Sequence, residues 1–178
     1  RPRPRPRILN VTLMPVATAS KAHYRPAVGV AVFNSDGHVW LGKRFGEKGP
    51  YSWQMPQGGI DEGEKPKAAA KRELWEETGI RVKDVTLLGS VEDWLYYDFP
   101  PEHQGPKSRG WMGQRQKWFA FRYHGNEKKI DLKSHGPQEF SKWKWAELSD
   151  APKLIVPFKR KVYERLLIEF EGYAKPVD

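Results

Sequence analysis

The chain has 178 residues, the size of one ordinary domain, which is enough to bury a sizeable core without covalent staples. Lys and Arg total 31 against 22 Asp and Glu, so the formal charge of +9 favours polyanionic partners such as nucleic acid, nucleotides or anionic membrane surfaces. The absence of cysteine excludes disulfides and thiolate metal sites and suits a reducing compartment. The most apolar stretch, Ala27 to Phe33, is too short to span a bilayer. We therefore expect a soluble, cytoplasmic protein without a membrane partner.

The N-terminal residues differ in composition from the rest. Arg1 to Arg7 alternates Arg and Pro, and the next thirteen residues contain no acidic side chain. This composition predicts a disordered basic extension over residues 1–23, with a natural start at Met14 as the simplest explanation. A transit peptide would be similarly acid-poor, but proline at every second position disfavours its amphipathic helix. We expect one folded domain over residues 24–174 and a short C-terminal tail over residues 175–178.

The elements expected first along the chain are a hairpin, a short strand and a loop. Apolar residues run from Val28 to Phe33, Asn34 to Gly37 is a typical turn sequence, and strand-like residues resume from Val39 to Leu41. Tyr51 to Met55 is a candidate strand. The sequence Pro56-Gln57-Gly58-Gly59 predicts a loop, which is a common place for chemistry.

Two helices are expected in the remainder. Ala68 to Glu77 is rich in helix formers, Pro66 suits the first helical turn, and Gly79 stands where a left-handed cap ends a helix. Near the C-terminus, the apolar residues Phe158, Val162, Leu166 and Phe170 recur every four positions, which predicts an amphipathic helix. Expected strands are Val85 to Leu88, Trp118 to Tyr123 and Trp143 to Trp145, and Asp98 to Gln116 is expected to be a long loop. This alternation predicts an α/β domain with a mixed sheet covered on both faces.

Three carboxylates share one face of the first expected helix. Glu73, Glu76 and Glu77 fall within an arc of about 100° at 3.6 residues per turn. Inside the helix only Arg72, four residues before Glu76, offers compensation, and like charges at such spacings cost about 0.2–0.5 kcal/mol per pair. A solvated acidic face would explain the pattern. That is the commoner origin of such a pattern, and the alternative is a site for Mg²⁺ or Mn²⁺, which prefer carboxylate oxygen.

The surrounding residues favour the metal site. Gly58, Glu64, Arg72-Glu73-Leu74, Glu76-Glu77 and Gly79-Ile80 match the Nudix box, G-x5-E-x7-R-E-U-x-E-E-x-G-U with U aliphatic, at every position. The chain therefore resembles the Nudix hydrolases. The resemblance implies an α/β/α sandwich with a mixed sheet, a divalent metal, and hydrolysis of a nucleoside diphosphate linked to another group. It also implies that Glu73, Glu76, Glu77 and the Gly58 carbonyl bind metal, that Arg72 organises the glutamates, and that Glu64 supports the loop.

The flanks of the box narrow the resemblance. Tyr24-Arg25-Pro26, Trp53 to Ile60, Gly113 to Phe119, Pro137 to Phe140 and Val156 to Arg160 are similar to the bacterial RNA pyrophosphohydrolases and the related dinucleoside polyphosphate hydrolases. One departure is Arg115, where relatives often have Lys, a change that keeps the charge and alters its geometry.

This subgroup resemblance assigns further roles by position. Glu139 would be a metal ligand or the general base that activates water. The residues that would line the polyphosphate path are Arg25, Arg44, Ser52, Tyr97, Gln114, Lys117 and Lys159. Val156 and Phe158 would bracket the first base, where an aromatic face contributes about 1–3 kcal/mol by stacking. The helical spacing of Phe158 equally fits packing in the core.

Three functions are compared. The first is a pyrophosphohydrolase that converts 5′-triphosphorylated RNA to a 5′-monophosphate end, and the second is hydrolysis of diadenosine tetraphosphate and similar dinucleotides. The third is a non-catalytic nucleotide- or RNA-binding module, which the complete set of box carboxylates disfavours. The sequence favours neither substrate over the other and neither Mg²⁺ over Mn²⁺, and it indicates no obligate protein partner.

Overall fold

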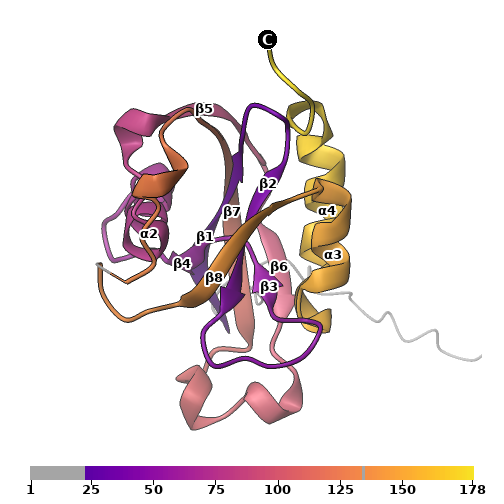
Figure 1. Cartoon of the computed structure of the whole chain (residues 1–178). Coiled ribbons are helices and arrows are strands. Elements are labelled where there is room, and N and C mark those ends of the chain that lie inside the picture. The colour runs from indigo at the N-terminus through magenta and orange to yellow at the C-terminus, as the bar shows by residue number, and fades with distance from the viewer. Residues whose placement is uncertain (1–22, 134) are drawn as a thin grey trace, which may run out of the picture.

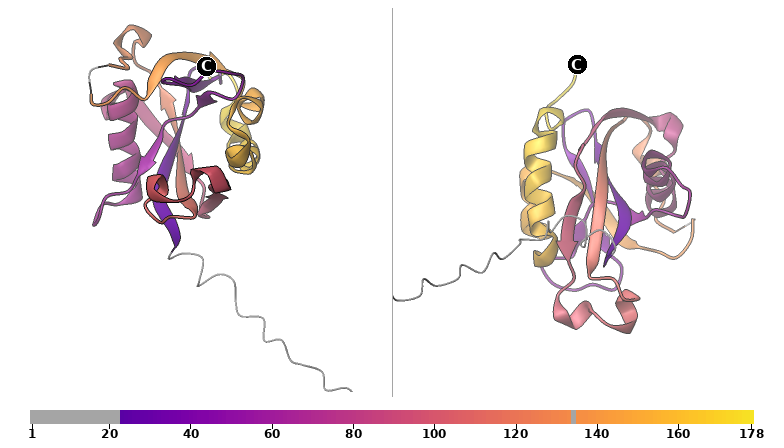
Figure 2. Two further views of the ribbon diagram at one scale, coloured as in Figure 1. Left: turned by 90° about the horizontal axis from the view of Figure 1, so that it is seen from below. Right: turned by 180° about the vertical axis from the view of Figure 1, so that it is seen from behind.

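One mixed β-sheet lies between two helical layers. In this computed structural model, which describes residues 23–133 and 135–178, helix α2 (Pro66–Thr78) covers one face of the sheet. Helices α3 (Ala151–Leu154) and α4 (Arg160–Phe170) cover the other face (Figure 1). The views in Figure 2 show α2 and α4 on opposite sides of the strands. The α/β/α sandwich expected from the sequence is confirmed.

The sheet contains eight strands in the described residues. They are β1 (Tyr24–Phe33), β2 (Val39–Arg44), β3 (Trp53–Gln54), β4 (Gln57–Gly59), β5 (Val85–Ser90), β6 (Leu95–Asp98), β7 (Gly113–Tyr123) and β8 (Phe140–Ala146). The order is β3-β2-β1-β7-β5, with β4 beside β1, β6 beside β7 and β8 beside β2. Strands β1 and β7 run parallel along the whole of β1, while the other pairs are antiparallel, so the sheet is mixed as expected.

Strand β1 is buried on both faces, which explains its unbroken apolar sequence. Val28, Val30 and Val32 pack in the cluster that contains Ala69, Ala70 and Leu74 of α2. Ala31 and Phe33 point the opposite way and pack in the cluster that contains Val162, Leu166 and Phe170 of α4. The period-two alternation of a strand thus distributes one sequence between two cores. The four-residue repeat near the C-terminus is buried as the amphipathic pattern predicts, except that Phe158 precedes the helix.

Helix α2 forms where the sequence predicts it. Pro66 occupies the first turn, where its missing N–H leaves no hydrogen bond unmade. At the other end Gly79 has a φ of 73°, and its N–H donates to the Trp75 carbonyl, so the left-handed cap is confirmed. These two ends fix the rotation of the helix, and its buried face carries Glu77 together with Leu74.

Three expectations about local structure are corrected. Gln57–Gly59 is strand β4 instead of a loop, because its backbone pairs with Ala27–Gly29 of β1 and needs no side-chain propensity. Only Trp53 and Gln54 of the candidate strand Tyr51 to Met55 form β3. The expected loop from Asp98 to Gln116 shrinks to residues 99–112, because Gly113 to Gln116 pair with β1 and Asp98 ends β6. Tertiary pairing outweighs local propensity in each case.

The structure describes the C-terminal tail but only one residue of the expected N-terminal extension. The extension expected over residues 1–23 lies outside the described residues except for His23, whose carbonyl accepts a hydrogen bond from the Met112 N–H. In the C-terminal tail, the Val177 N–H donates to the Ser35 carbonyl at 2.9 Å. Among the described residues, no helix has the length and apolar character needed to cross a membrane.

Candidate active site

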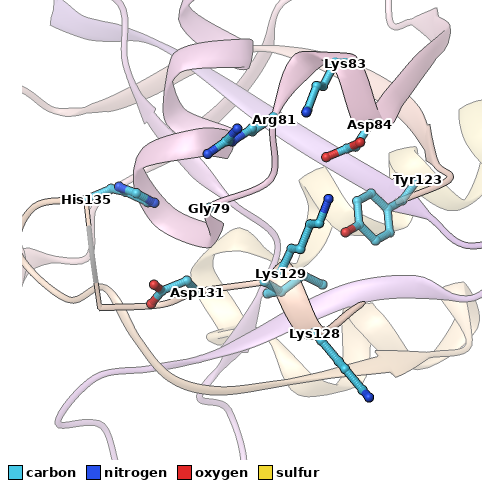
Figure 3. Close-up of a pocket in the computed structure, with 10 residues that line it drawn as sticks. Gly79, Arg81, Lys83, Asp84, Tyr123, Lys128, Lys129, Asp131 and His135 are labelled. Carbon is cyan, nitrogen blue, oxygen red and sulfur yellow. The ribbon is translucent and has the colours of Figure 1, made fainter. Parts of the chain in front are cut away.

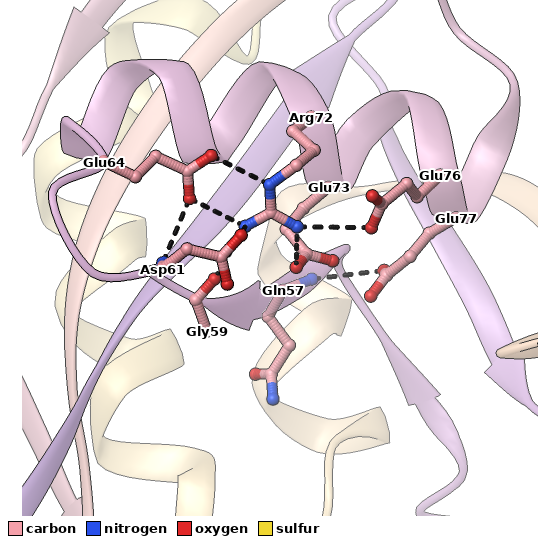
Figure 4. Close-up of polar contacts among 8 residues, drawn as sticks. All are labelled: Gln57, Gly59, Asp61, Glu64, Arg72, Glu73, Glu76 and Glu77. Atoms are coloured by element: carbon pink, nitrogen blue, oxygen red, sulfur yellow. Dashed lines mark hydrogen bonds and ion pairs between the residues drawn. The ribbon is translucent and has the colours of Figure 1, made fainter. Parts of the chain in front are cut away.

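Arg72 of α2 is the centre of a network of carboxyl groups (Figure 4). Its Nε and Nη2 each donate to Glu64 at 2.8 Å, and Nη2 also donates to the Gly59 carbonyl at 2.9 Å. Its Nη1 donates to Glu73 at 2.8 Å and to Glu76 at 3.2 Å. The planar guanidinium matches this fork geometry, which a lysine ammonium would not. Arg72 therefore joins the loop after β4 to the acidic face of α2.

The bond between Arg72 and Glu64 supports a prediction about acid stability. Arg72 holds the pKa of Glu64 down at about 2, below its ordinary 4.5. A depressed carboxyl pKa stabilises the fold above pH 4.5, and that stabilisation is lost as the pH falls toward 2. We expect Glu64→Gln to lower the free energy of unfolding by about 2 kcal/mol at neutral pH after partial screening, and by almost nothing near pH 2. Urea titrations at several pH values measure this, with the exposed Glu62→Gln as control; an equal loss at every pH would contradict the assignment.

The three helix glutamates sit in different environments. Glu77 is 8% exposed and accepts a hydrogen bond from the Gln57 N–H at 3.3 Å. Burial, followed by the charges of Glu73 and Glu139, raises the pKa of Glu77 well above its ordinary value. Burial also raises the pKa of Glu73, although Arg72 opposes the rise. The side chain of Glu76 is 39% exposed at the outer edge. The three carboxyl groups together need more positive charge beside them than Arg72 provides, and a bound cation would supply it.

Gly58 brings the sheet close to these carboxyl groups. A Cβ atom at position 58 would overlap the carboxyl group of Glu73, so any larger residue there would displace that carboxyl group. Within residues 23–133 and 135–178, no three His, Cys, Asp or Glu side chains already enclose a metal position. In this arrangement the Arg72 guanidinium donates hydrogen bonds to one carboxylate oxygen of Glu73 and one of Glu76. The donor set is nevertheless all oxygen and mostly anionic, which fits a hard divalent cation.

Glu139 joins the network from a distant part of the sequence. It directly precedes β8, and its carbonyl accepts a hydrogen bond from the Phe45 N–H at 2.8 Å. Its exposed carboxylate is close enough for its charge to raise the pKa of both Glu73 and Glu77. The structure therefore brings Glu139 close to the helix glutamates, with Glu139 on the solvent side, which is compatible with the role that the family resemblance implies.

A cleft of about 540 Å³ is connected to the carboxylates through Gln57, which lines the cleft and whose backbone N–H donates to Glu77. One part of the cleft is aromatic: the Phe158 ring lies 5.8 Å from Tyr97 and 5.4 Å from His103, measured between ring centroids. The cationic residues in its wall are Arg44, Lys107 and Lys159. Aromatic faces beside cations suit a nucleobase attached to phosphates.

Lys159 is the most buried cation of the cleft. It is 7% exposed, and its Nζ donates to Gln54 Oε1 at 3.3 Å and lies 5.5 Å from the centre of the Tyr97 ring. Burial, and then the charge of Arg44, lower the pKa of Lys159 to about 7, while Glu77 opposes this change. Phosphate oxygens beside Lys159 would favour its charged form.

Of the nine residues that were expected to bind substrate, some line the cleft and others lie outside its lining. Five of them line the cleft: Arg44, Tyr97, Gln114, Phe158 and Lys159. Arg25 is near enough for its charge to act on Tyr97, and Val156 packs partly buried against the core. Ser52 is 2% exposed, and its hydroxyl donates to the Gly49 carbonyl instead of lining the cleft. Lys117 donates to the Glu92 carbonyl and lines a different cavity.

Sequence reasoning missed much of one cleft wall. The additional lining residues are Gln57, Phe99, Glu102, His103, Lys107 and Ser108. Most of them lie in residues 99–112, where two short 3-10 turns, Pro101–His103 and Pro106–Ser108, shape the chain. The Pro and Gly residues of this segment indicated a loop, but they carried no signal for which side chains face the cleft.

Comparison with known proteins identifies the family. The NUDIX domain matches residues 23–166. An RNA pyrophosphohydrolase of Caulobacter vibrioides is 54% identical over 154 residues, covering 85% of this chain and 88% of the relative. An RNA pyrophosphohydrolase of Agrobacterium fabrum is 49% identical over 158 residues, covering 83% of this chain and 92% of the relative.

Solved structures support the fold. The E. coli dihydroneopterin triphosphate pyrophosphohydrolase has a TM-score of 0.64 at 22% identity, covering 82% of this chain and 98% of the other. A C. elegans Ap4A hydrolase has a TM-score of 0.57 at 21% identity, with the same two coverages.

The family match spans the sheet, α2 and the whole carboxylate network, and the relatives agree with it over most of their length. This chain belongs to the NUDIX family and is a Nudix hydrolase.

Proposed function

We propose that this protein is an RNA pyrophosphohydrolase, which releases pyrophosphate from 5′-triphosphorylated RNA and leaves a 5′-monophosphate end. The observation that carries the proposal is the junction at Gln57, where a cleft with aromatic and cationic walls meets the buried carboxylates of α2. Relatives about half identical to the chain bear the name RNA pyrophosphohydrolase. The net charge of +9 also favours an RNA substrate.

Nudix hydrolases generally need divalent metal ions, and we assign the metal to Glu73, Glu76, Glu77 and the carbonyl of Gly58, and the role of base to Glu139. Mg²⁺ or Mn²⁺ is the proposed ion, because both prefer carboxylate and carbonyl oxygen. When bound, it neutralises charge on the phosphate oxygens and lowers the pKa of water. Arg72 then serves as the organiser that fixes the helix glutamates relative to the loop after β4.

The cleft residues position the substrate. Phe158 and Val156 are assigned to the first base, and Arg44 and Lys159 to the phosphates as charge-assisted donors. Arg25, Tyr97 and Gln114 complete the proposed polyphosphate path. Ser52 is proposed to act through the backbone, because its carbonyl accepts a hydrogen bond from the Arg44 N–H at 2.8 Å. Lys117 would meet only a part of the substrate outside the cleft.

Glu139 is the proposed general base. The helix glutamates are assigned to the metal and cannot freely accept a proton, whereas Glu139 is exposed and faces the same network. The attacking water transfers a proton to the Glu139 carboxylate while its oxygen bonds to phosphorus. The anhydride P–O bond between the first and second phosphates breaks, and its electron pair stays with the departing pyrophosphate. The 5′ end retains one phosphate.

The second candidate function is hydrolysis of dinucleoside polyphosphates. The same cleft and carboxylates would serve it, since both substrates present a nucleoside attached to a phosphate chain. A direct test compares kcat/KM for 5′-triphosphorylated RNA and diadenosine tetraphosphate at equal concentrations, in Mg²⁺ and in Mn²⁺. A higher value for RNA supports the proposal, and a higher value for the dinucleotide in both metals would replace it with the second candidate.

Phe158→Ala tests the proposed base contact. We expect KM to rise about fivefold or more with a smaller change in kcat, because base stacking contributes about 1–3 kcal/mol to binding. Ile168→Ala is the control, since Ile168 is 75% exposed on α4, away from the cleft lining. Unchanged KM in a folded Phe158→Ala variant would show that Phe158 only packs against Tyr97.

The reducing cytoplasm is the proposed location. The absence of cysteine from the chain suits a reducing compartment.

A further inference from the structure

A second cavity, of about 520 Å³, lies beyond the C-terminal end of α2 (Figure 3). Four segments form it: the residues directly after α2, the end of β7 at Tyr123, the 3-10 turn η5 (Glu127–Lys129), and the loop that precedes β8. Its basic residues are Arg81, Lys83, Lys128, Lys129 and His135. Its acidic residues are Asp84 and Asp131, so the cavity carries excess positive charge.

The Lys and Arg residues of this cavity, Arg81, Lys83, Lys128 and Lys129, take part in none of the ion pairs found among residues 23–133 and 135–178. Figure 3 shows Lys83 and Lys129 extending toward the same space from opposite walls, while Lys128 points away. Like charges that face one another repel, and a bound anion would remove this repulsion.

The cavity wall has a fixed framework. The Asn126 side chain accepts a hydrogen bond from the Lys128 N–H at 2.9 Å, and the Tyr123 hydroxyl donates to the Asn126 carbonyl at 2.7 Å. Glu127 accepts a hydrogen bond from Trp145 Nε1 at 2.7 Å, so its carboxylate is engaged elsewhere. The backbone that carries Lys129 is therefore held before any ligand arrives, which lowers the entropic cost of binding.

The cavity adjoins the proposed catalytic site. Gly79, in its wall, follows Glu77 by two residues, about 3 Å along a helix axis. The Trp75 ring, 41% exposed, stacks on His135 with centroids 4.0 Å apart, beside Glu76 in the sequence. The stacked pair thus connects α2, next to Glu76, to the cavity wall. Cations beside aromatic rings are the features that hold single-stranded nucleic acid.

We propose that this basic cavity binds backbone phosphates of the RNA substrate downstream of its 5′ end, through Arg81, Lys83 and Lys129. The proposal rests on the proposed function, because it concerns the body of the RNA whose 5′ end enters the cleft. It predicts that the cavity contributes to RNA affinity and contributes nothing to a substrate without a downstream chain. Diadenosine tetraphosphate has no downstream chain.

The first test measures binding without catalysis. A labelled 5′-hydroxyl RNA of about 12 nucleotides, within the site sizes known for single strands, is titrated by fluorescence anisotropy without metal. We expect Lys83→Glu/Lys129→Glu to weaken binding about fivefold or more and to reduce the slope of log K against log salt by about 1.4 for two lost contacts. Lys153→Glu/Lys175→Glu is the control, because it makes the same change in net charge at exposed positions outside the cavity.

The second test separates the cavity from the catalytic site. KM for a triphosphorylated RNA of the same length should rise in Lys83→Glu/Lys129→Glu, while kcat/KM for diadenosine tetraphosphate stays at the wild-type value. Equal loss of RNA affinity in both double variants, or no loss in either, would overturn the proposal. So would binding of inorganic phosphate that only the cavity variant loses, with RNA affinity unchanged. Failure of the wild type to hydrolyse RNA would refute the proposed function alone, since the binding test needs no hydrolysis.

Discussion

Glu77→Gln is expected to lower kcat about 10²- to 10³-fold, equivalent to about 3–4 kcal/mol of lost transition-state stabilisation. Glu77 is the most buried of the helix glutamates, and its replacement removes a proposed metal ligand from the interior of the site. The fold should tolerate the change. Burial and neighbouring charges raise the pKa of Glu77, so without metal its ionisation destabilises the protein as the pH rises from its ordinary 4.5 through the raised value. The neutral amide removes that cost.

Thermal unfolding separates this account from simple damage. In a chelating buffer at neutral pH, Glu77→Gln should melt at the wild-type temperature or above it. Metal at about a hundred times its dissociation constant should raise the wild-type Tm by about 5–10 °C and the variant Tm by much less. Glu164→Gln, exposed on α4, is the control. Wild-type turnover by Glu77→Gln at saturating metal, or the same metal-induced shift in both proteins, would remove Glu77 from the metal site.

Glu139→Gln is expected to lower kcat about a hundredfold or more, the usual range when a general base is removed, with little change in KM. The amide keeps the shape of the side chain but accepts no proton from water. Activity should recover in part at higher pH, because solvent hydroxide then replaces the nucleophile that the base generates near neutrality. A variant that retains wild-type kcat at neutral pH would return the role of base to Glu76 or Glu73.

Most of the fold could be predicted because its signals are local. The turn after Phe33, the proline at the start of α2 and the cap at Gly79 each act within a few residues, and all three are found as expected. Strand β4 could not be predicted, because Gln57–Gly59 has no strand propensity and forms through pairing with β1. The start of β7 was hidden for the same reason, since its partner lies some ninety residues earlier in the chain.

The candidate site likewise contains residues that the sequence could predict and residues that it could not. The helix glutamates and Arg72 share one face of a single helix, so their spacing alone placed them together. Glu139 needed the resemblance to a family, because only the fold brings its loop to α2. The contribution of His103 to the cleft depends on how residues 99–112 fold over Phe158, and no periodic pattern encodes it. The basic cavity beyond α2 likewise combines segments some fifty residues apart.

The central claim is that the carboxylate network hydrolyses the 5′ end of RNA. Its most direct test is the product of one reaction: a short RNA with a 5′-triphosphate, incubated with the protein and Mg²⁺ and resolved by mass spectrometry. The account predicts RNA of unchanged length that carries a 5′-monophosphate, together with released pyrophosphate, in wild type, and far less of both products from Glu77→Gln in the same time. RNA that stays triphosphorylated in both Mg²⁺ and Mn²⁺, although the protein binds it, would contradict the claim and support a non-catalytic binding module.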